Sequence, residues 1–289
     1  MILNEMLLVV DNLPKIFGAI GAFSPQGVGI ATAIVGGTGL FIGLFLGFAG
    51  KKFEVEVDDK EIKVRELLPG ANCGGCGYAG CDALAKAIAS GEAPINSCPV
   101  ANQAVHDDIA AVMGVEAIAT EKKVSFVKCS GTCDKTVDKY EYFGAQDCKM
   151  AALVPGKGNK KCSFGCMGFG SCVKVCEFDA IHIVDGIALV DKSKCTGCSK
   201  CVAECPNDLI ELVPIKSRTL VSCSSYDKGK DVKAACSAGC IGCKLCVKAC
   251  EYDAIHVEDN LAYIDYSKCT NCNKCAEICP VKVILVQQA

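Results

Sequence analysis

The sequence predicts an α+β protein with one long apolar helix near its N-terminus, followed by small domains built around cysteine side chains. Three observations lead to this fold class. Residues 28–49 carry no charge, 25 of the 289 residues are cysteine, and the cysteine spacing of residues 162–205 repeats at residues 236–279, an offset of 74 residues. Small domains that fold around metal ligands need less hydrophobic burial than an ordinary globular domain.

Residues 28–49 read VGIATAIVGGTGLFIGLFLGFA. A helix of about 20 apolar residues spans the hydrocarbon core of a bilayer. We therefore expect a transmembrane helix at 28–50, preceded by an apolar N-terminal segment at 1–27. Because Asp11 and Pro14 interrupt that segment, we expect it to lie at the membrane interface or against a partner, with a second crossing as the alternative.

Lys51 and Lys52 follow the expected span, and only Lys15 precedes it. The positive-inside rule therefore puts the residues after 50 in the cytoplasm. A cleaved secretory signal is the alternative, but the apolar run starts late and lacks a charged leader and an Ala-x-Ala type site. We expect a single-pass protein of the cell membrane with its cysteine-rich part on the cytoplasmic side.

So many cysteines are compatible with a disulfide-rich secreted protein or with an intracellular metal protein. Most of them fall in C-x2-C runs, where neighbouring sulfurs converge on one centre, and this pattern favours metal ligation. A reducing cytoplasm favours the same interpretation. The net charge of -3 argues against nucleic acid as a partner.

A first cysteine module is expected at residues 67–120, after a charged linker at 51–66. Its cysteines have the spacing C-x2-C-x4-C-x16-C and are Cys73, Cys76, Cys81 and Cys98. Nearby glycines free the backbone to point N–H groups at sulfur, and a helix at 82–90 ending at Gly91 returns the chain to Cys98. A zinc ion would also suit four thiolates, but we favour a [4Fe–4S] cluster because of the motifs that follow.

Two cysteine-rich halves follow, with one ligand pattern. The first contains Cys162, Cys166, Cys172, Cys176, Cys195, Cys198, Cys201 and Cys205, and the second contains Cys236, Cys240, Cys246, Cys250, Cys269, Cys272, Cys275 and Cys279. Three runs have the spacing C-x2-C-x2-C-x3-C of bacterial two-cluster ferredoxins, in which the fourth cysteine serves the opposite cluster. We predict two tandem 2[4Fe–4S] ferredoxin domains, at 162–213 and 214–289, each made of duplicated β-hairpins and short helices. One hairpin is expected to join 180–184 to 187–190.

Three ligand sets follow from these runs. They are Cys195, Cys198, Cys201 and Cys176; Cys240, Cys243, Cys246 and Cys279; and Cys269, Cys272, Cys275 and Cys250. A fourth set is irregular because Phe169 stands where the second half has Cys243. It contains Cys166, Cys172 and Cys205, and we expect Cys162 to complete it as the nearest candidate.

Five cysteines lie outside these sets: Cys129, Cys133, Cys148, Cys223 and Cys236. Cys148 and Cys223 have similar positions ahead of the two halves and are interpreted as remnants of the repeat. In the alternative, an extra cluster uses Cys129, Cys133, Cys148 and Cys162, three of which belong to an insert at 121–161. We expect at least five [4Fe–4S] clusters, and no more than six.

A membrane helix, the motif LPGANCGGCGYAGC at 68–81 and ferredoxin repeats occur here in one order. This order resembles the B subunit of the Rnf complexes, membrane-bound ferredoxin:NAD oxidoreductases of bacteria. The resemblance covers nearly the whole chain, and its most specific part is the motif directly after a single span. The second ferredoxin repeat and the insert at 121–161 depart from simpler members of the family, so a cluster number does not carry over.

The resemblance implies an electron-transfer subunit that exchanges electrons with soluble ferredoxin and with the other subunits of an ion-translocating complex. The chain has no dinucleotide-binding glycine motif and no ionisable residue in the span, so we expect no bound NAD or flavin and no substrate chemistry in this chain alone. The alternatives are a relay subunit of another membrane-bound dehydrogenase and a membrane-anchored structural zinc protein with an interaction role.

Overall fold

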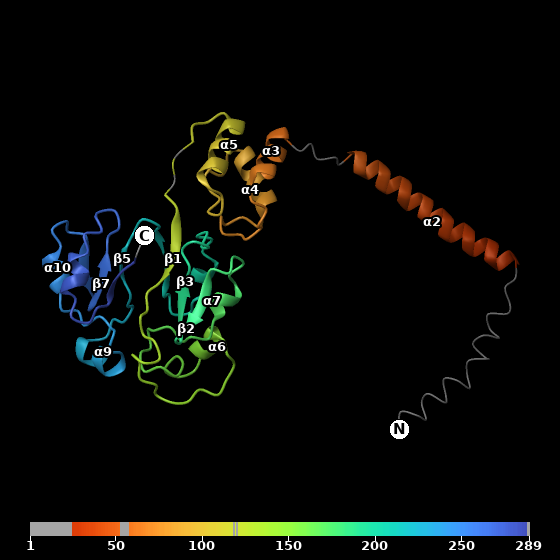
Figure 1. Cartoon of the computed structure of the whole chain (residues 1–289). Helices are drawn as coiled ribbons and strands as arrows, with labels where there is room; N and C mark the ends of the chain where they lie inside the picture. Colours follow the sequence, from red (N-terminus) through yellow and green to blue (C-terminus); the bar gives the residue numbers. More distant parts are fainter. Residues whose placement is uncertain (1–24, 53–57, 118, 120, 288–289) are drawn as a thin grey trace, which may run out of the picture. The chain divides into compact units, whose positions relative to one another are not determined.

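A computed structural model describes residues 25–52, 58–117, 119 and 121–287 (Figure 1). The chain divides into two units, at 1–57 and 58–289. Helix α2, Pro25–Lys52, is the described part of the first unit. Its segment Thr32–Gly50 is long and apolar enough to cross a membrane. Most of the predicted N-terminal segment 1–27 lies outside the described residues.

A three-helix domain opens the second unit. Its helices are α3 (Asp59–Leu67), α4 (Cys81–Ala89) and α5 (Gln103–Met113). Val64, Leu84 and Ile109 meet in its core. Residues 59–66, expected to be linker, are therefore helical, because Asp58 caps the backbone of Lys60 and the helix buries Val64 against α4. The predicted helix at 82–90 is confirmed within one residue at each end.

Two β-hairpins carry the repeat. They are β2 (Ile181–Val184) with β3 (Ile187–Val190), and β6 (Ile255–Glu258) with β7 (Leu261–Ile264). The first agrees with the predicted hairpin within one residue, and its turn residues Asp185 and Gly186 both have positive φ, as a two-residue hairpin loop requires. One short helix lies within each cysteine run and contains its third cysteine: α7 (Ser171–Lys174), α8 (Lys200–Glu204), α10 (Leu245–Ala249) and α11 (Lys274–Ile278).

Each half is closed by a pair of strands from its two ends. β1 (Lys123–Val127) pairs antiparallel with β4 (Ile210–Pro214), and β5 (Thr219–Val221) with β8 (Ile284–Val286). We call the part from β1 to β4 the first repeat domain and the part from β5 to β8 the second. The first therefore begins at β1 and not at residue 162, because four of the five residues of this strand, which we expected in an insert, are buried in the domain.

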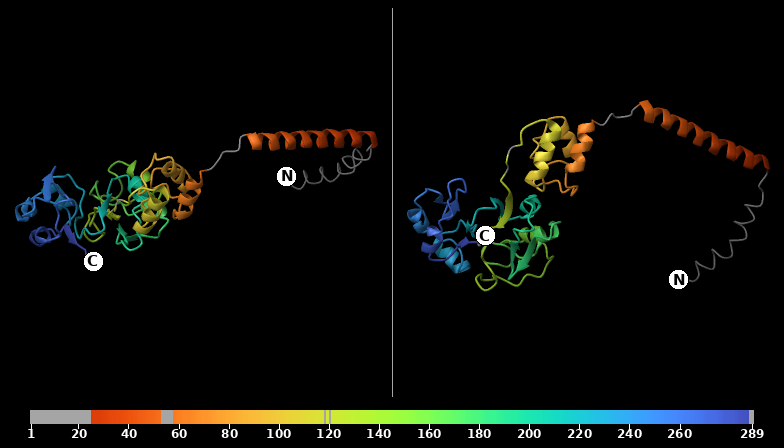
Figure 2. Two further views of the ribbon diagram at one scale, coloured as in Figure 1. Left: turned by 90° about the horizontal axis from the view of Figure 1, so that it is seen from above. Right: turned by 45° about the horizontal axis from the view of Figure 1, so that its top comes forward.

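The two repeat domains also contain helices that precede their cysteine runs. Helix α6 is Cys148–Ala152, and helix α9 is Gly229–Ala235. The domains lie side by side in both views of Figure 2, green and blue. Hydrogen bonds join them: the Oγ of Ser130 donates to the Oγ of Ser222 at 2.7 Å, and the Oγ of Ser224 donates to the carbonyl oxygen of Lys128 at 3.3 Å. These contacts fix the strand ends of the two domains against each other.

Candidate iron–sulfur cluster sites

The fold gathers the cysteines in groups of four. The Cys73, Cys76, Cys81 and Cys98 side chains line one cavity beside α4. The regular runs line two more, one with Cys240, Cys243, Cys246 and Cys279, and one with Cys250, Cys269, Cys272 and Cys275. Around Cys201 lie Cys195, Cys198 and Cys176. The structure thus brings together the cysteines of each of these four expected sets, and their role as cluster ligands stays a prediction.

Backbone N–H groups point at sulfur in these sets. Ala254 N donates to the Sγ of Cys250 at 3.4 Å, and Ala180 N donates to that of Cys176 at 3.4 Å. Burial raises the pKa of the Cys98 thiol, whereas the backbone N–H groups of Ala101 and Val100 act in the opposite direction. Such bonds favour a negatively charged sulfur, which is the state of a ligand to iron.

The irregular set differs from our expectation. Cys166, Cys172 and Cys205 share a cavity with Cys148, and Cys162 does not line it. Burial raises the pKa of the Cys172 thiol to about 12, and the sulfurs of Cys166, Cys148 and Cys205 add to that effect. The prediction that Cys162 completes this set is therefore wrong in this structure, and so is the interpretation of Cys148 as a remnant.

Packing around Phe169 accounts for the presence of Cys148, and not Cys162, in this set. Phe169 stands at the sequence position of the missing cysteine, and its ring packs against the ring of Tyr142 at a centroid distance of 5.1 Å. This contact holds the segment that leads into α6, whose first residue is Cys148. The backbone N–H of Cys148 donates to the Oγ of Ser171 at 2.8 Å, and that hydroxyl donates to Asp147. A cysteine from an earlier segment, Cys148, is thus the fourth thiol of this group.

A sixth set, which we call the bridging set, lies between the repeat domains. It consists of Cys129, Cys162, Cys223 and Cys236, which line the largest of the cysteine cavities, of about 450 Å³. Each domain supplies one cysteine two residues beyond its first strand and one that precedes its first cysteine run. The alternative set with Cys133 and Cys148 is therefore wrong, and Cys129, not Cys148, is the counterpart of Cys223.

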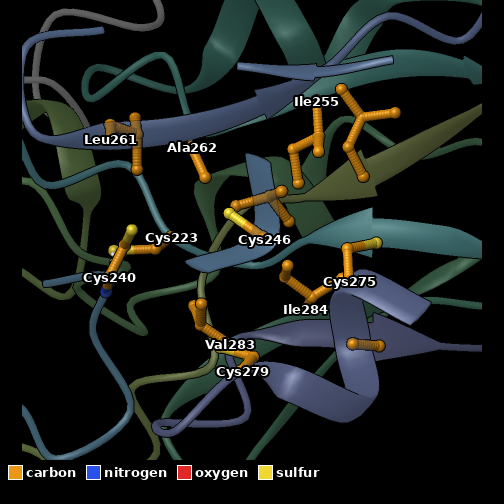
Figure 3. Packing of buried hydrophobic residues seen from close by; sticks show 13 residues of the cluster. Cys223, Cys240, Cys246, Ile255, Leu261, Ala262, Cys275, Cys279, Val283 and Ile284 are labelled. Carbon is orange, nitrogen blue, oxygen red and sulfur yellow. Dashed lines mark hydrogen bonds between the residues drawn. The ribbon is translucent and has the colours of Figure 1, made fainter. Parts of the chain in front are cut away.

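Four backbone N–H groups donate to sulfurs of the bridging set. Cys129 accepts from Gly131 N and Cys166 N, each at 3.4 Å. Cys223 accepts from Ser225 N at 3.5 Å and from Cys240 N at 3.3 Å. Figure 3 shows Cys223 and Cys240 side by side in the core of the second repeat domain. The two domains therefore present equivalent donors to equivalent sulfurs.

The six sets use 24 of the 25 cysteines, and Cys133 is the one left over. Its side chain is exposed. Among the described residues, no group of three or more His, Cys, Asp or Glu side chains is arranged to hold a single metal ion. Four thiols around a cavity, with N–H groups directed at the sulfurs, suit an iron–sulfur cluster as a ligand set.

Consecutive sets are close neighbours. Burial raises the pKa values of Cys198, Cys172 and Cys246, and in each case a sulfur of an adjacent set adds to the effect. Two hydrogen bonds described above link the bridging set to its neighbours. The linked pairs are Cys73 with Cys198, Cys201 with Cys172, Cys166 with Cys129, Cys223 with Cys240, and Cys246 with Cys275. These contacts link the six sets in one series.

Hairpin-and-helix domains with four-thiol sets define the class as iron–sulfur electron-transfer proteins of the ferredoxin type. Family models agree: the Fe-S cluster model matches residues 68–100, the 4Fe-4S binding domain model matches 188–211, and the 4Fe-4S dicluster domain model matches 239–283.

Three curated relatives resemble most of the chain, and each is the B subunit of a redox complex. That of the Na(+)-translocating ferredoxin:NAD(+) oxidoreductase complex of Acetobacterium woodii is 48% identical, over 88% of this chain and 77% of that protein. That of the ion-translocating oxidoreductase complex of Methanosarcina acetivorans is 44% identical, over 87% and 96%. That of the proton-translocating ferredoxin:NAD(+) oxidoreductase complex of Clostridium ljungdahlii is 43% identical, over 85% and 88%.

The chain belongs to this family, the B subunits of the Rnf-type ion-translocating oxidoreductase complexes, and is an iron–sulfur electron-transfer subunit. The resemblance found in the sequence is thereby confirmed.

Proposed function

We propose that the chain relays electrons between soluble ferredoxin and the other subunits of a ferredoxin:NAD+ oxidoreductase complex, along six [4Fe–4S] clusters held in one series. This proposal rests on the series of six neighbouring thiol sets. Each bound cluster would accept and release single electrons, at a potential within the wide range of about -700 to +450 mV that such centres cover. Along the chain, helix α2 is followed by the three-helix domain, which we call the four-cysteine domain. The two repeat domains come next, and we call them the first and second ferredoxin domains.

The bridging set decides whether this relay is continuous. The three sets before it belong to the four-cysteine domain and the first ferredoxin domain, and the two after it belong to the second. Because its sulfurs come equally from both domains, it is the point where the two halves of the series meet. A chain with only five clusters would lack this connection.

Electrons would enter and leave at the two ends of the series. One end is the set of the four-cysteine domain, and the other is the set that contains Cys272. The Cys272 side chain is exposed, so a soluble carrier has access to that end. We assign ferredoxin to this end and the partner subunits to the other.

Helix α2 supports a membrane anchor, and Lys51 and Lys52 after it support a cytoplasmic position for the cysteine-rich part. The segment Thr32–Gly50 carries no ionisable side chain, so ion translocation is assigned to other subunits. The curated relatives include one named for Na(+) and one named for protons. The chain itself supplies the electron relay.

A double-mutant comparison tests the bridging set. Cys162→Ala and Cys223→Ala should each damage the same cluster, although these residues lie in different domains. Iron loss in the double variant should therefore equal that in either single variant, measured on the anaerobically purified chain. Additive loss would place the two residues in different centres and would overturn the assignment. The matched control is Cys133→Ala, which should lose no iron.

A further inference from the structure

Lys160 carries a buried ammonium group at the bridging set. The residue is only 5% exposed and lines the cavity of Cys129, Cys162, Cys223 and Cys236. Its Nζ donates to the carbonyl oxygen of Gly131 at 3.0 Å and to that of Gly186 at 2.8 Å. In the part of the chain that the structure describes, no carboxylate forms an ion pair with it. Its positive charge is therefore held in place by neutral groups and is not cancelled.

Lys160 lies beside the sulfurs of the bridging set. The carbonyl oxygen of Gly131 accepts its hydrogen bond, and a Cβ at Gly131 would lie 3.5 Å from the Sγ of both Cys129 and Cys236. Hydroxyl-bearing residues add polarity to the bridging cavity, namely Ser130, Thr136, Ser222, Ser224 and Ser225.

This environment has no equivalent at the other cavities described above. Their linings contain a single lysine, Lys244, which is exposed. Lys128 also lines the bridging cavity, but its Nζ lies 3.2 Å from the carboxylate of Glu211. At the repeat offset of 74 residues, the counterpart of Lys160 is Ala234. The two domains thus contribute equivalent sulfurs but only one buried cation.

We propose that Lys160 tunes the bridging cluster electrostatically, raising its reduction potential so that an electron is stabilised where the two ferredoxin domains meet. Reduction adds one electron, supplied by the neighbouring reduced centre, and breaks no bond. No bond to Lys160 forms or breaks in this step. Because a nearby positive charge stabilises the added negative charge, its removal makes the centre harder to reduce. This inference rests on the proposed function.

The test is an EPR-monitored redox titration of the full chain, purified without oxygen. The bridging signal is identified as the one that Cys223→Ala removes. Lys160→Gln removes the charge but keeps an N–H donor for the two carbonyl oxygens, whereas Lys160→Arg keeps the charge. The control Lys244→Gln removes an exposed lysine from the lining of another cavity.

In Lys160→Gln, we expect unchanged iron and at least a tenfold weaker reduction of the bridging centre, which is a midpoint lower by about 59 mV for one electron. Lys160→Arg and Lys244→Gln should keep the midpoint of the bridging centre close to that of the unmodified chain. An unchanged midpoint in Lys160→Gln would overturn the inference, and so would loss of the bridging cluster from that variant, because Lys160 would then be needed only for assembly. If Cys223→Ala removes no signal, the proposed function fails first, and this inference fails with it.

Discussion

Hydrogen bonds to individual sulfurs distinguish these sites from one another. Ser125 is 2% exposed, and its Oγ lies 3.2 Å from the Sγ of Cys201. Burial raises the pKa of the Cys201 thiol, and this hydrogen bond opposes the rise. The hydroxyl thus favours the thiolate, which is the form that binds iron.

Ser125→Ala should make one centre more sensitive to acid. Without the hydrogen bond the pKa of Cys201 rises further, so protons compete with iron at a higher pH. A net hydrogen bond of about 1 kcal/mol corresponds to roughly 0.7 pH unit. Iron release during anaerobic acidification should therefore begin at a higher pH than in the unmodified chain. Superimposable release curves would contradict this role, and Ser193→Ala, at an exposed hydroxyl bonded to Asp191, is the control.

Cys148 and Cys133 make a second comparison between single residues. Cys148→Ala should remove or degrade one cluster, because its sulfur is the fourth in the irregular set. Cys133→Ala should leave iron, sulfide and EPR signals unchanged, because that side chain belongs to none of the six sets. Iron analysis of both variants checks the prediction, and loss of iron from Cys133→Ala alone would reverse the assignment.

The spacing of the cysteines predicts the regular ligand sets because each run places three sulfurs on one tight loop. It does not predict Cys148, whose place in the irregular set depends on the packing of Phe169 against Tyr142. The bridging set did leave a signal, since Cys162 and Cys236 are equivalent in the repeat. This equivalence indicates that Cys162 and Cys236 have the same role in their two domains. It does not indicate that Cys162 replaces the cysteine missing at Phe169.

At the scale of elements, the loop around Gly75 in the four-cysteine domain packs against the loop around Cys198 in the first ferredoxin domain. A Cβ at Gly75 would lie 2.6 Å from the carbonyl oxygen of Cys198, so only glycine allows this approach. The same contact brings Cys73 close to Cys198. Two neighbouring sets of the series therefore depend on a backbone-to-backbone contact that the cysteine spacing does not encode.

Gly75→Ala should separate these two elements without removing a ligand. Overpacking of this kind costs about 1–3 kcal/mol. Hydrogen exchange should therefore increase both in the loop around Cys198 and in the four-cysteine domain. Gly77→Ala is the control, because a Cβ there meets nothing within 4 Å and only the positive φ of 86° is strained. Equal exchange around Cys198 in both variants would show that the contact is dispensable.

Some of these elements were predictable from the sequence, and others were not. The β2–β3 hairpin was predictable from its turn, since Asp185-Gly186 supplies two residues that accept positive φ. Helix α3 was expected to be linker because charged residues dominate it, and its single fully buried apolar residue, Val64, is visible only once α4 is packed against it. Strand β1 was assigned to an insert because its partner β4 lies more than 80 residues away in the sequence.

At the scale of the whole molecule, a helix long and apolar enough to cross a membrane is followed along the chain by six neighbouring thiol sets. Family membership and ferredoxin domains explain why such a chain carries electrons, and in the proposed relay the bridging set connects the two repeat domains. The number of clusters is the feature on which this continuity depends. Five centres would leave the two domains without a link between them.

The most direct test is the iron, acid-labile sulfide and zinc content of the full chain, purified in detergent without oxygen. Six centres predict about 24 iron atoms and a matching amount of sulfide per chain, because each [4Fe–4S] cluster holds four of each. About 20 iron atoms, with Cys223→Ala unchanged, would remove the bridging cluster and break the series. Zinc without sulfide would contradict the electron relay altogether.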